Sequence, residues 1–162
     1  MPGCGKTTAV TKIVAGLKDA NLAGFYTEEI RQNNIRKGFH WTTLAGETGI
    51  LAHVDFKGPF KVGKYGVDVA GFEKSALPAL DPELFVIDEI GKMECFSQKF
   101  IAAVRRLFAS DASVLATVAR KGTGLIRQVK NYPGTKICNL TTETRDKTVY
   151  DILQILSFLK KP

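Results

Sequence analysis

Residues 3–8 read Gly-Cys-Gly-Lys-Thr-Thr and lead directly into a helical pattern. The pattern begins at Lys6, and its apolar residues recur with the spacing of one helix face, at Val10, Ile13, Val14 and Leu17. Glycines let successive backbone N–H groups turn toward an anion, and a helix N-terminus adds its dipole and unpaired donors. The stretch matches the C-terminal part of the phosphate-loop pattern GxxxxGK(S/T). It therefore predicts a phosphate-binding loop at the start of the first helix.

The residues of this loop have distinct predicted roles. Lys6 is expected to reach the β- and γ-phosphates of a nucleotide, and the Thr7 hydroxyl is expected to coordinate Mg²⁺. Thr8 would contribute its N–H or its hydroxyl near the α-phosphate. The backbone supplies the remaining contacts to the nucleotide, and these are expected from Pro2, Gly3, Cys4 and Gly5.

The loop pattern also predicts a strand in front of it. The first glycine of the full pattern falls one position before Met1, and the strand that feeds the loop falls before that. We therefore expect the first strand, of about 5–6 residues, to be missing from the centre of the sheet. Such a gap would expose two strand edges and part of the core.

A second motif, Leu84-Phe85-Val86-Ile87-Asp88-Glu89, follows about 80 residues later. Its continuous apolar run is typical of a strand buried on both faces. At the carboxyl end of a parallel strand, Asp88 would face the phosphates and hold Mg²⁺, directly or through water. Glu89 would accept a proton from, or orient, the water that attacks the γ-phosphorus. Either motif alone has an ordinary structural explanation, but together and in this order they favour a nucleotide site.

The rest of the chain predicts a single α/β domain over residues 1–162. Residues 24–54 carry strand patterns separated by turn residues, which indicate an antiparallel insert. In the second half, strands alternate with helices, which implies right-handed crossovers and a mostly parallel sheet flanked by helices. The expected strands are 24–30, 35–44, 48–54, 84–87, 113–118 and 135–140, and the expected helices are 6–20, 68–80, 97–109, 123–130 and one near the C-terminus.

Composition excludes several classes of protein. Of the 162 residues, 44% are hydrophobic and 24% charged, which is ordinary for a globular chain and not for a disordered one. No run approaches the roughly 18 apolar residues of a membrane span, and the N-terminus lacks the apolar core of a signal peptide. Three cysteines at unrelated spacings favour free thiols and a cytoplasmic setting. The formal charge of +7 is dispersed, and it indicates either a solvated basic surface or a basic mouth that attracts a polyanion.

Longer blocks of sequence resemble one known family. The strongest runs from Val86 to Glu94 and reads Val-Ile-Asp-Glu-Ile-Gly-Lys-Met-Glu; another is Gly24-Phe25-Tyr26-Thr27-Glu28-Glu29. Residues 141–146 resemble the family's Thr-x-Glu-Asn-Arg-Asp, with Thr144 where Asn is usual. The chain is similar, over nearly its whole length, to the small P-loop nucleoside-triphosphatases of thermophilic prokaryotes and the cancer-related nucleoside-triphosphatase of animals.

The resemblance implies a RecA-like P-loop fold. It also implies Mg²⁺-dependent hydrolysis of nucleoside triphosphates to diphosphate and phosphate, with tolerance of several bases. In that reaction Lys6 and Glu89 are the expected catalytic residues, and Thr7 and Asp88 are the expected metal ligands.

Arg145 follows the predicted strand over 135–140, which would place it at the carboxyl end of the sheet near the base. A guanidinium stacks on any nucleobase, so this position would suit loose base selection. The alternative is a surface salt bridge with Asp146 or Glu143.

Other functions remain open at this point. A small nucleotide or metabolite kinase would use the same loop with an acceptor other than water, although the Asp88-Glu89 pair favours water. A nucleotide-dependent RNA-binding switch would suit the positive charge, although no RNA-binding motif is visible. We expect a monomer that binds nucleoside triphosphates, with neither a membrane nor a nucleic acid as a partner.

Overall fold

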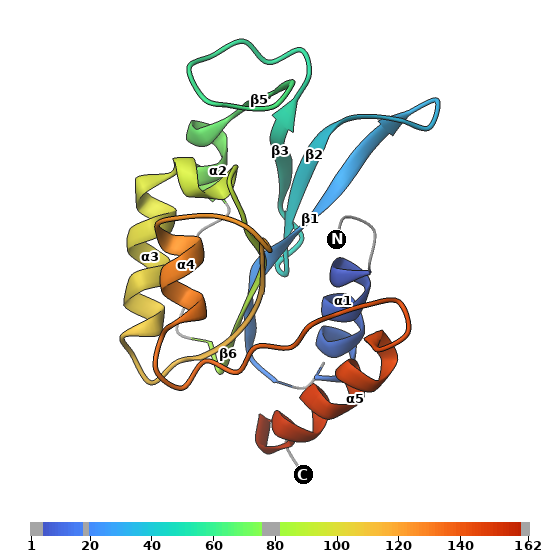
Figure 1. The fold of residues 1–162 in the computed structure, drawn as a ribbon, viewed down its shortest axis with the longest axis vertical. Coiled ribbons are helices and arrows are strands. Elements are labelled where there is room, and N and C mark those ends of the chain that lie inside the picture. The colour runs from blue at the N-terminus through green and yellow to red at the C-terminus, as the bar shows by residue number, and fades with distance from the viewer. Residues whose placement is uncertain (1–4, 18–19, 76–81, 160–162) are drawn as a thin grey trace.

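The structure is a computed structural model that describes residues 5–17, 20–75 and 82–159 (Figure 1). Its described strands form one sheet in the order β4-β5-β3-β2-β1-β6-β7. The strands are β1 (Leu22–Gln32), β2 (Ile35–Thr43), β3 (Thr48–His53), β4 (Lys61–Val62), β5 (Tyr65–Val67), β6 (Leu84–Ile90) and β7 (Ser113–Val118). The helices are α1 (Lys6–Gly16), α2 (Val69–Ser75), α3 (Gln98–Phe108), α4 (Leu125–Lys130) and α5 (Arg145–Ile155), with 3₁₀ turns η1 (Glu94–Phe96) and η2 (Ser157–Leu159).

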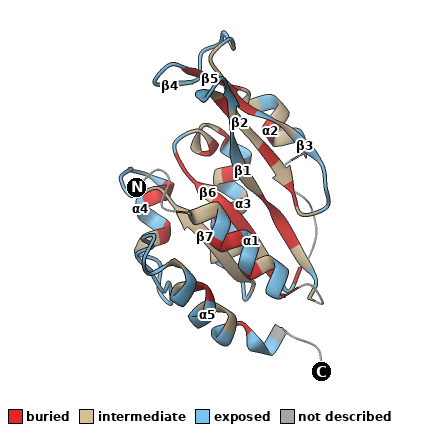
Figure 2. Cartoon of the chain, turned by 90° about the vertical axis from the view of Figure 1, so that its right-hand side faces the viewer, coloured by how far each residue is buried: buried red, intermediate tan, exposed pale blue. Residues whose placement is uncertain are grey.

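Helices cover both faces of the sheet (Figure 1). On one face α1 and α5 pack together, and on the other lie α2, α3 and α4. Each side has its own apolar cluster, and β6 contributes to both, with Val86 in the cluster of α1 and Ile87 in the cluster of α3. Figure 2 shows this strand as a buried line between the two layers. The prediction of a strand buried on both faces is therefore confirmed.

Strand β1 joins the two halves of the sheet. Leu22–Tyr26 pair in parallel with β6, whereas Phe25–Gln32 pair antiparallel with β2. A Cβ on Gly24 would lie 1.8 Å from the carbonyl oxygen of Val86, so only glycine allows this approach of β1 to β6. The antiparallel meander predicted over residues 24–54 is confirmed, but it belongs to the same sheet as β6 and β7.

The sheet is consequently more mixed than the sequence indicates. Among the described strands two pairings are parallel and four are antiparallel. The sequence predicts mostly parallel strands because the alternation of strands and helices in the second half dominates its pattern. The short β4–β5 hairpin continues the meander through β3, and this adds two of the antiparallel pairings.

The prediction of a strand over residues 135–140 is wrong. The structure has no strand there, and residues 135–139 are exposed. A strand forms when a neighbouring chain segment satisfies its N–H and C=O groups, and no described strand pairs with this segment. Strand β7 is the last strand of the described sheet on that side.

The other predicted elements are confirmed with small shifts of their ends. Helix α1 begins at Lys6, and Gly5 precedes it in a left-handed conformation with a φ of 82°. The Asp68 carboxylate accepts the N–H of Gly71 at 2.9 Å and so caps α2, while residues 76–80 of the predicted helix lie outside the described residues. Cys95 and Cys138 are free thiols. In the described part of the chain, no helix has the length and apolarity that crossing a bilayer requires.

Candidate nucleotide-binding and hydrolytic site

The start of α1 and the end of β6 meet at Asp88. The Thr7 hydroxyl donates a hydrogen bond to one carboxylate oxygen of Asp88 at 2.5 Å. The Thr117 hydroxyl, at the end of β7, donates to the other oxygen. Asp88 is only 2% exposed. The predicted helix N-terminus and the predicted strand end are therefore side by side, and an additional strand takes part.

The pKa of the Asp88 carboxyl is raised above its ordinary value. Burial is the largest cause, and the negative charge of Glu89 adds to it. The hydrogen bonds from Thr117 and Thr7 act in the opposite direction, as does the positive charge of Lys6. A buried carboxylate of this kind is stabilised in its charged form by a nearby cation.

Lys6 and Glu89 form the second contact between these segments. The Lys6 ammonium donates to a carboxylate oxygen of Glu89, and the two side chains remain 31% and 26% exposed. Water and ligands therefore have access to both. The residue predicted to hold phosphates and the residue predicted to activate water lie together.

The Thr7 hydroxyl and the Asp88 carboxylate suit a magnesium ion. Magnesium prefers oxygen ligands, and it is usually held by one or two carboxylates together with water and substrate phosphates. Thr7 supplies a hydroxyl and Asp88 a carboxylate at 2.5 Å from each other. No group of three or more His, Cys, Asp and Glu side chains that could hold a metal occurs among the described residues. One hydroxyl and one carboxylate suit a magnesium ion that completes its coordination with water and substrate phosphates.

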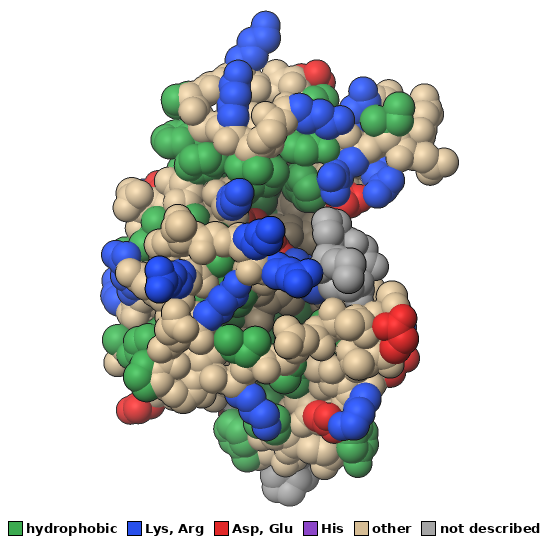
Figure 3. Space-filling view, in the orientation of Figure 1, with side chains coloured by type: hydrophobic (Ala, Val, Ile, Leu, Met, Phe, Trp, Pro, Cys, Tyr) green, Lys and Arg blue, Asp and Glu red, His purple; other side chains and the backbone are tan. Residues whose placement is uncertain are grey.

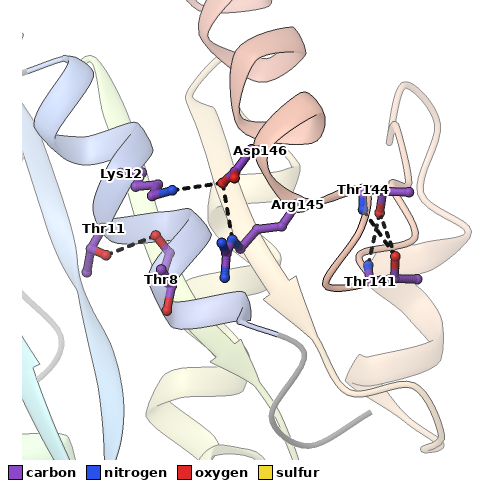
Figure 4. A network of polar contacts seen from close by, with 7 residues as sticks. All are labelled: Thr8, Thr11, Lys12, Thr141, Thr144, Arg145 and Asp146. Carbon is purple, nitrogen blue, oxygen red and sulfur yellow. Dashed lines mark hydrogen bonds and ion pairs between the residues drawn. The ribbon is translucent and has the colours of Figure 1, made fainter.

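Arg145 lies against the phosphate loop from the other side. A Cβ on Gly5 would be 3.0 Å from Cδ and 3.2 Å from Nη1 of Arg145. The Nε of Arg145 donates to Asp146 at 3.2 Å, and Lys12 of α1 donates to the same oxygen at 2.8 Å (Figure 4). The alternative considered from the sequence, an ion pair between Arg145 and Asp146, therefore forms. In this pair the Arg145 guanidinium still lies beside Gly5.

The segment that leads into Arg145 is fixed by two threonines. The Thr141 N–H donates to the Thr144 hydroxyl at 3.0 Å, and the Thr144 N–H approaches the Thr141 hydroxyl at 3.2 Å (Figure 4). Thr144 immediately precedes α5. The short hydroxyl side chain at this position therefore holds the turn from which Arg145 extends.

The remaining predicted loop contacts are only partly described. Thr8 is exposed in the first turn of α1, and its carbonyl accepts a hydrogen bond from the Thr11 hydroxyl (Figure 4). Pro2, Gly3 and Cys4 lie outside the described residues.

The structure adds two residues near the site that the sequence analysis missed. Thr117 stands at the end of a predicted strand, but only the pairing of β6 with β7 shows that it reaches Asp88. Glu94 closes the sequence block that begins at Val86, and its burial follows from the 3₁₀ turn that comes after β6.

Positive side chains gather across the middle of the face shown in Figure 3, beside a hollow. The chain carries 23 Lys and Arg residues against 16 Asp and Glu. A concave surface with one sign of charge raises the local concentration of oppositely charged ligands. This face therefore suits the approach of an anionic substrate.

A sequence profile described as NTPase matches residues 1–153, nearly the entire chain. The chain belongs to the NTPase family. Nucleoside-triphosphatase THEP1 of Thermotoga petrophila is 39% identical to it, in an alignment that covers 97% of this chain and 89% of that protein. The human protein named cancer-related nucleoside-triphosphatase is 38% identical, over 99% of this chain and 95% of the human one.

Solved structures agree with this assignment to the NTPase family. The crystal structure of THEP1 from Aquifex aeolicus superposes with a TM-score of 0.87 at 37% identity, and covers 99% of this chain and 96% of that one. The solution structure of the human nucleoside-triphosphatase has a TM-score of 0.80 at 36% identity, with the same coverage. The predicted fold class and the predicted enzyme class, a nucleoside-triphosphatase, are both confirmed.

Proposed function

We propose that this NTPase hydrolyses nucleoside 5′-triphosphates to diphosphate and phosphate in a Mg²⁺-dependent reaction with low base selectivity. The observation that carries the proposal is the pair of contacts that join α1 to β6. Thr7 meets Asp88 and Lys6 meets Glu89 in one small region. This places groups suited to phosphate, metal and water next to one another.

The start of α1 would bind the phosphates. The unpaired N–H groups of the first helical turn and the ammonium of Lys6 all favour negative charge. Phosphate oxygens that reach Lys6 compete with Glu89 for the same ammonium. Binding of a triphosphate would thus leave the Glu89 carboxylate free to accept a hydrogen bond from water.

The metal would be held by the Thr7 hydroxyl and the Asp88 carboxylate. Bound there, Mg²⁺ would neutralise charge on the β- and γ-phosphates. The Thr117 hydrogen bond keeps one Asp88 oxygen in place while the other faces Thr7. The chain's own contribution is therefore one hydroxyl and one oriented carboxylate.

Glu89 would act as the general base. It would take a proton from the attacking water as the water oxygen forms a bond to the γ-phosphorus. The bond from the γ-phosphorus to the β,γ-bridging oxygen then breaks, and the diphosphate leaves with the electron pair. Lys6 would stabilise the negative charge that spreads over the transferred phosphoryl group.

Arg145 would account for the low base selectivity. Its planar guanidinium lies beside Gly5 and is oriented by Asp146. A stacked guanidinium contacts the face that every base shares and does not depend on the hydrogen-bonding edge. We therefore assign it to the nucleobase side of the loop.

Phosphate release from ATP, GTP, CTP and UTP, with and without Mg²⁺, tests the proposal. We expect release from all four that depends on the metal and is abolished in Lys6→Ala. The control is Lys74→Ala, which removes an exposed ammonium of α2. Activity that persists when all divalent metal is chelated would contradict the metal requirement, and release from only one triphosphate would contradict low selectivity. Because no acceptor is added, phosphate release also separates hydrolysis from the kinase alternative.

A further inference from the structure

Glu94 is a buried acid that the proposed hydrolysis does not use. It begins η1, shortly after β6 ends, and it is only 4% exposed. Among the described residues, no Lys or Arg forms an ion pair with it. A buried carboxyl group without a cationic partner is costly to keep charged. The burial of this carboxyl group beside the site therefore needs a physical explanation.

Gly91 separates Glu94 from Glu89. A Cβ on Gly91 would lie 2.7 Å from a carboxyl oxygen of Glu94 and 3.0 Å from a carboxyl oxygen of Glu89. The two carboxyl groups thus converge on a residue that has no side chain to keep them apart. Both carboxyl groups therefore lie against the turn at Gly91.

The backbone closes this turn tightly. The N–H of Cys95 donates to the carbonyl of Gly91 at 3.1 Å, and the N–H of Ser97 donates to the carbonyl of Glu94 at 3.0 Å. Ser97 then caps α3 through its hydroxyl, which accepts the N–H of Phe100 at 2.9 Å. The turn is therefore anchored on a buried helix start, and Glu94 lies between that anchor and Glu89.

The surroundings of Glu94 favour its neutral form. Burial, the largest cause, raises its pKa to about 8, and the negative charges of Glu89 and Asp88 act in the same direction. Polar backbone groups of Glu94 and Gly91 oppose the shift without overcoming it. The other titratable groups on η1 and on the helices packed against it are Cys95 of η1, Glu73 and Lys74 of α2, and Lys99, Arg105 and Arg106 of α3. Lys6 of α1 pairs with Glu89. Burial and the charge of Glu94 raise the pKa of the Cys95 thiol to about 11.

We propose that Glu94 is a positioning residue of the hydrolytic site, which as a neutral acid holds the turn at Gly91 and thereby keeps the Glu89 carboxylate in place. The inference rests on the proposed role of Glu89 as the base. Ionised Glu94 would add a third negative charge beside Asp88 and Glu89. That charge would push the Glu89 carboxylate away from its position and oppose the approach of phosphates.

The pH dependence of kcat/KM for Mg²⁺-bound ATP, which reports the titration of groups in the free enzyme, tests this role. We expect kcat/KM of the wild-type protein to fall as pH rises past about 8, by roughly tenfold for each unit beyond the midpoint. Glu94→Gln keeps the shape of the side chain but cannot ionise. We expect it to retain kcat/KM at pH 7 within about threefold and to lose the alkaline fall. The matched control, Cys95→Ala, removes the neighbouring thiol and should keep the fall.

An alkaline fall of the same size in Glu94→Gln would overturn the proposal, as would a wild-type profile that stays flat. If Glu94→Gln does not fold, the carboxyl carbon of Glu94 can be titrated by NMR in the wild-type protein. A midpoint near its ordinary pKa of 4.5 would then overturn the proposal, and one near the raised value would support it. Glu89→Gln in the same assay separates the two claims. Normal turnover in that variant refutes the base assignment, whereas loss of turnover there with an unchanged fall in Glu94→Gln refutes only the role of Glu94.

Discussion

The contact between Lys6 and Glu89 joins residues 83 positions apart in the chain. Both ends of the pair keep access to solvent, so it can be exchanged for contacts with a charged ligand. Asp88, one residue earlier, is instead buried and fixed by two hydroxyl groups. Neighbouring acids thus have different surroundings, and this difference supports different roles for them.

Arg145 carries a prediction at the same scale. If its guanidinium stacks on the base, Arg145→Ala should raise KM for ATP, GTP, CTP and UTP by a similar factor, because all bases present a face. Stacking on a base contributes about 1–3 kcal/mol, which corresponds to an increase of roughly 5- to 150-fold, with kcat nearly unchanged. Steady-state kinetics with the four substrates measures this.

Lys147→Ala is the matched control for Arg145→Ala, because Lys147 is an exposed cation in the same turn of α5 that pairs with Asp151. A KM increase confined to one base would contradict the stacking assignment. An equal KM increase in Lys147→Ala would show that the effect of Arg145→Ala comes from the change in net charge.

Four residues of the candidate site can be predicted individually from the sequence. Two short motifs, each a contiguous stretch of the chain, predict Lys6, Thr7, Asp88 and Glu89. Thr117 and Glu94 do not follow, since their importance depends on strand order and on burial. Neither property is carried by the residue's own neighbours in sequence.

At the scale of elements, η1 provides a prediction about stability. The pKa of Glu94 rises from an ordinary 4.5 to about 8 on folding, so the native state retains a proton that the unfolded chain has lost. Stability from this group is therefore full below pH 4.5 and is lost as pH rises through about 8. Relative to Glu94→Gln, the wild-type free energy of unfolding should fall by up to about 1.4 kcal/mol per pH unit in this window.

Urea unfolding of both proteins at about pH 5 and about pH 8 measures this difference. Glu73→Gln serves as the control, because the pKa of Glu73 is lowered by its hydrogen bond from Ser97. A constant difference in stability between wild type and Glu94→Gln across the two pH values would contradict the raised pKa.

The elements also show where sequence patterns stop being informative. The apolar run of β6 predicts a buried strand because a strand covered on both faces needs apolar residues on both. Residues 135–140 also contain residues that favour strands, such as Thr135 and Ile137, yet no described strand pairs with them, and they stay irregular. A local pattern reports a preference for extended backbone, whereas a strand also requires a neighbour.

Strand β1 determines the architecture of the protein. Its first residues continue the parallel pairing of β6, and its later residues start the antiparallel meander. The two apolar clusters lie on opposite sides of the sheet that results. The sequence predicts both parallel and antiparallel strand pairing, but it does not predict that both occur in one sheet. The reason is that the close approach of β1 to β6 at Gly24 is a tertiary contact.

Where α1 and β6 meet, Glu89 is the residue that we propose as the base. Glu89→Gln keeps a side chain that can hydrogen-bond Lys6, so nucleotide binding should persist while proton removal from water is lost. The control is Glu47→Gln, which changes an exposed acid in the turn between β2 and β3.

Single-turnover hydrolysis of Mg²⁺-bound ATP by wild-type, Glu89→Gln and Glu47→Gln proteins, with ATP affinity measured in parallel, tests the role of Glu89. We predict that Glu89→Gln binds ATP with nearly the wild-type affinity and hydrolyses it about 10²- to 10⁴-fold more slowly, while Glu47→Gln behaves as wild type. Hydrolysis by Glu89→Gln at the wild-type rate would show that Glu89 is not the base.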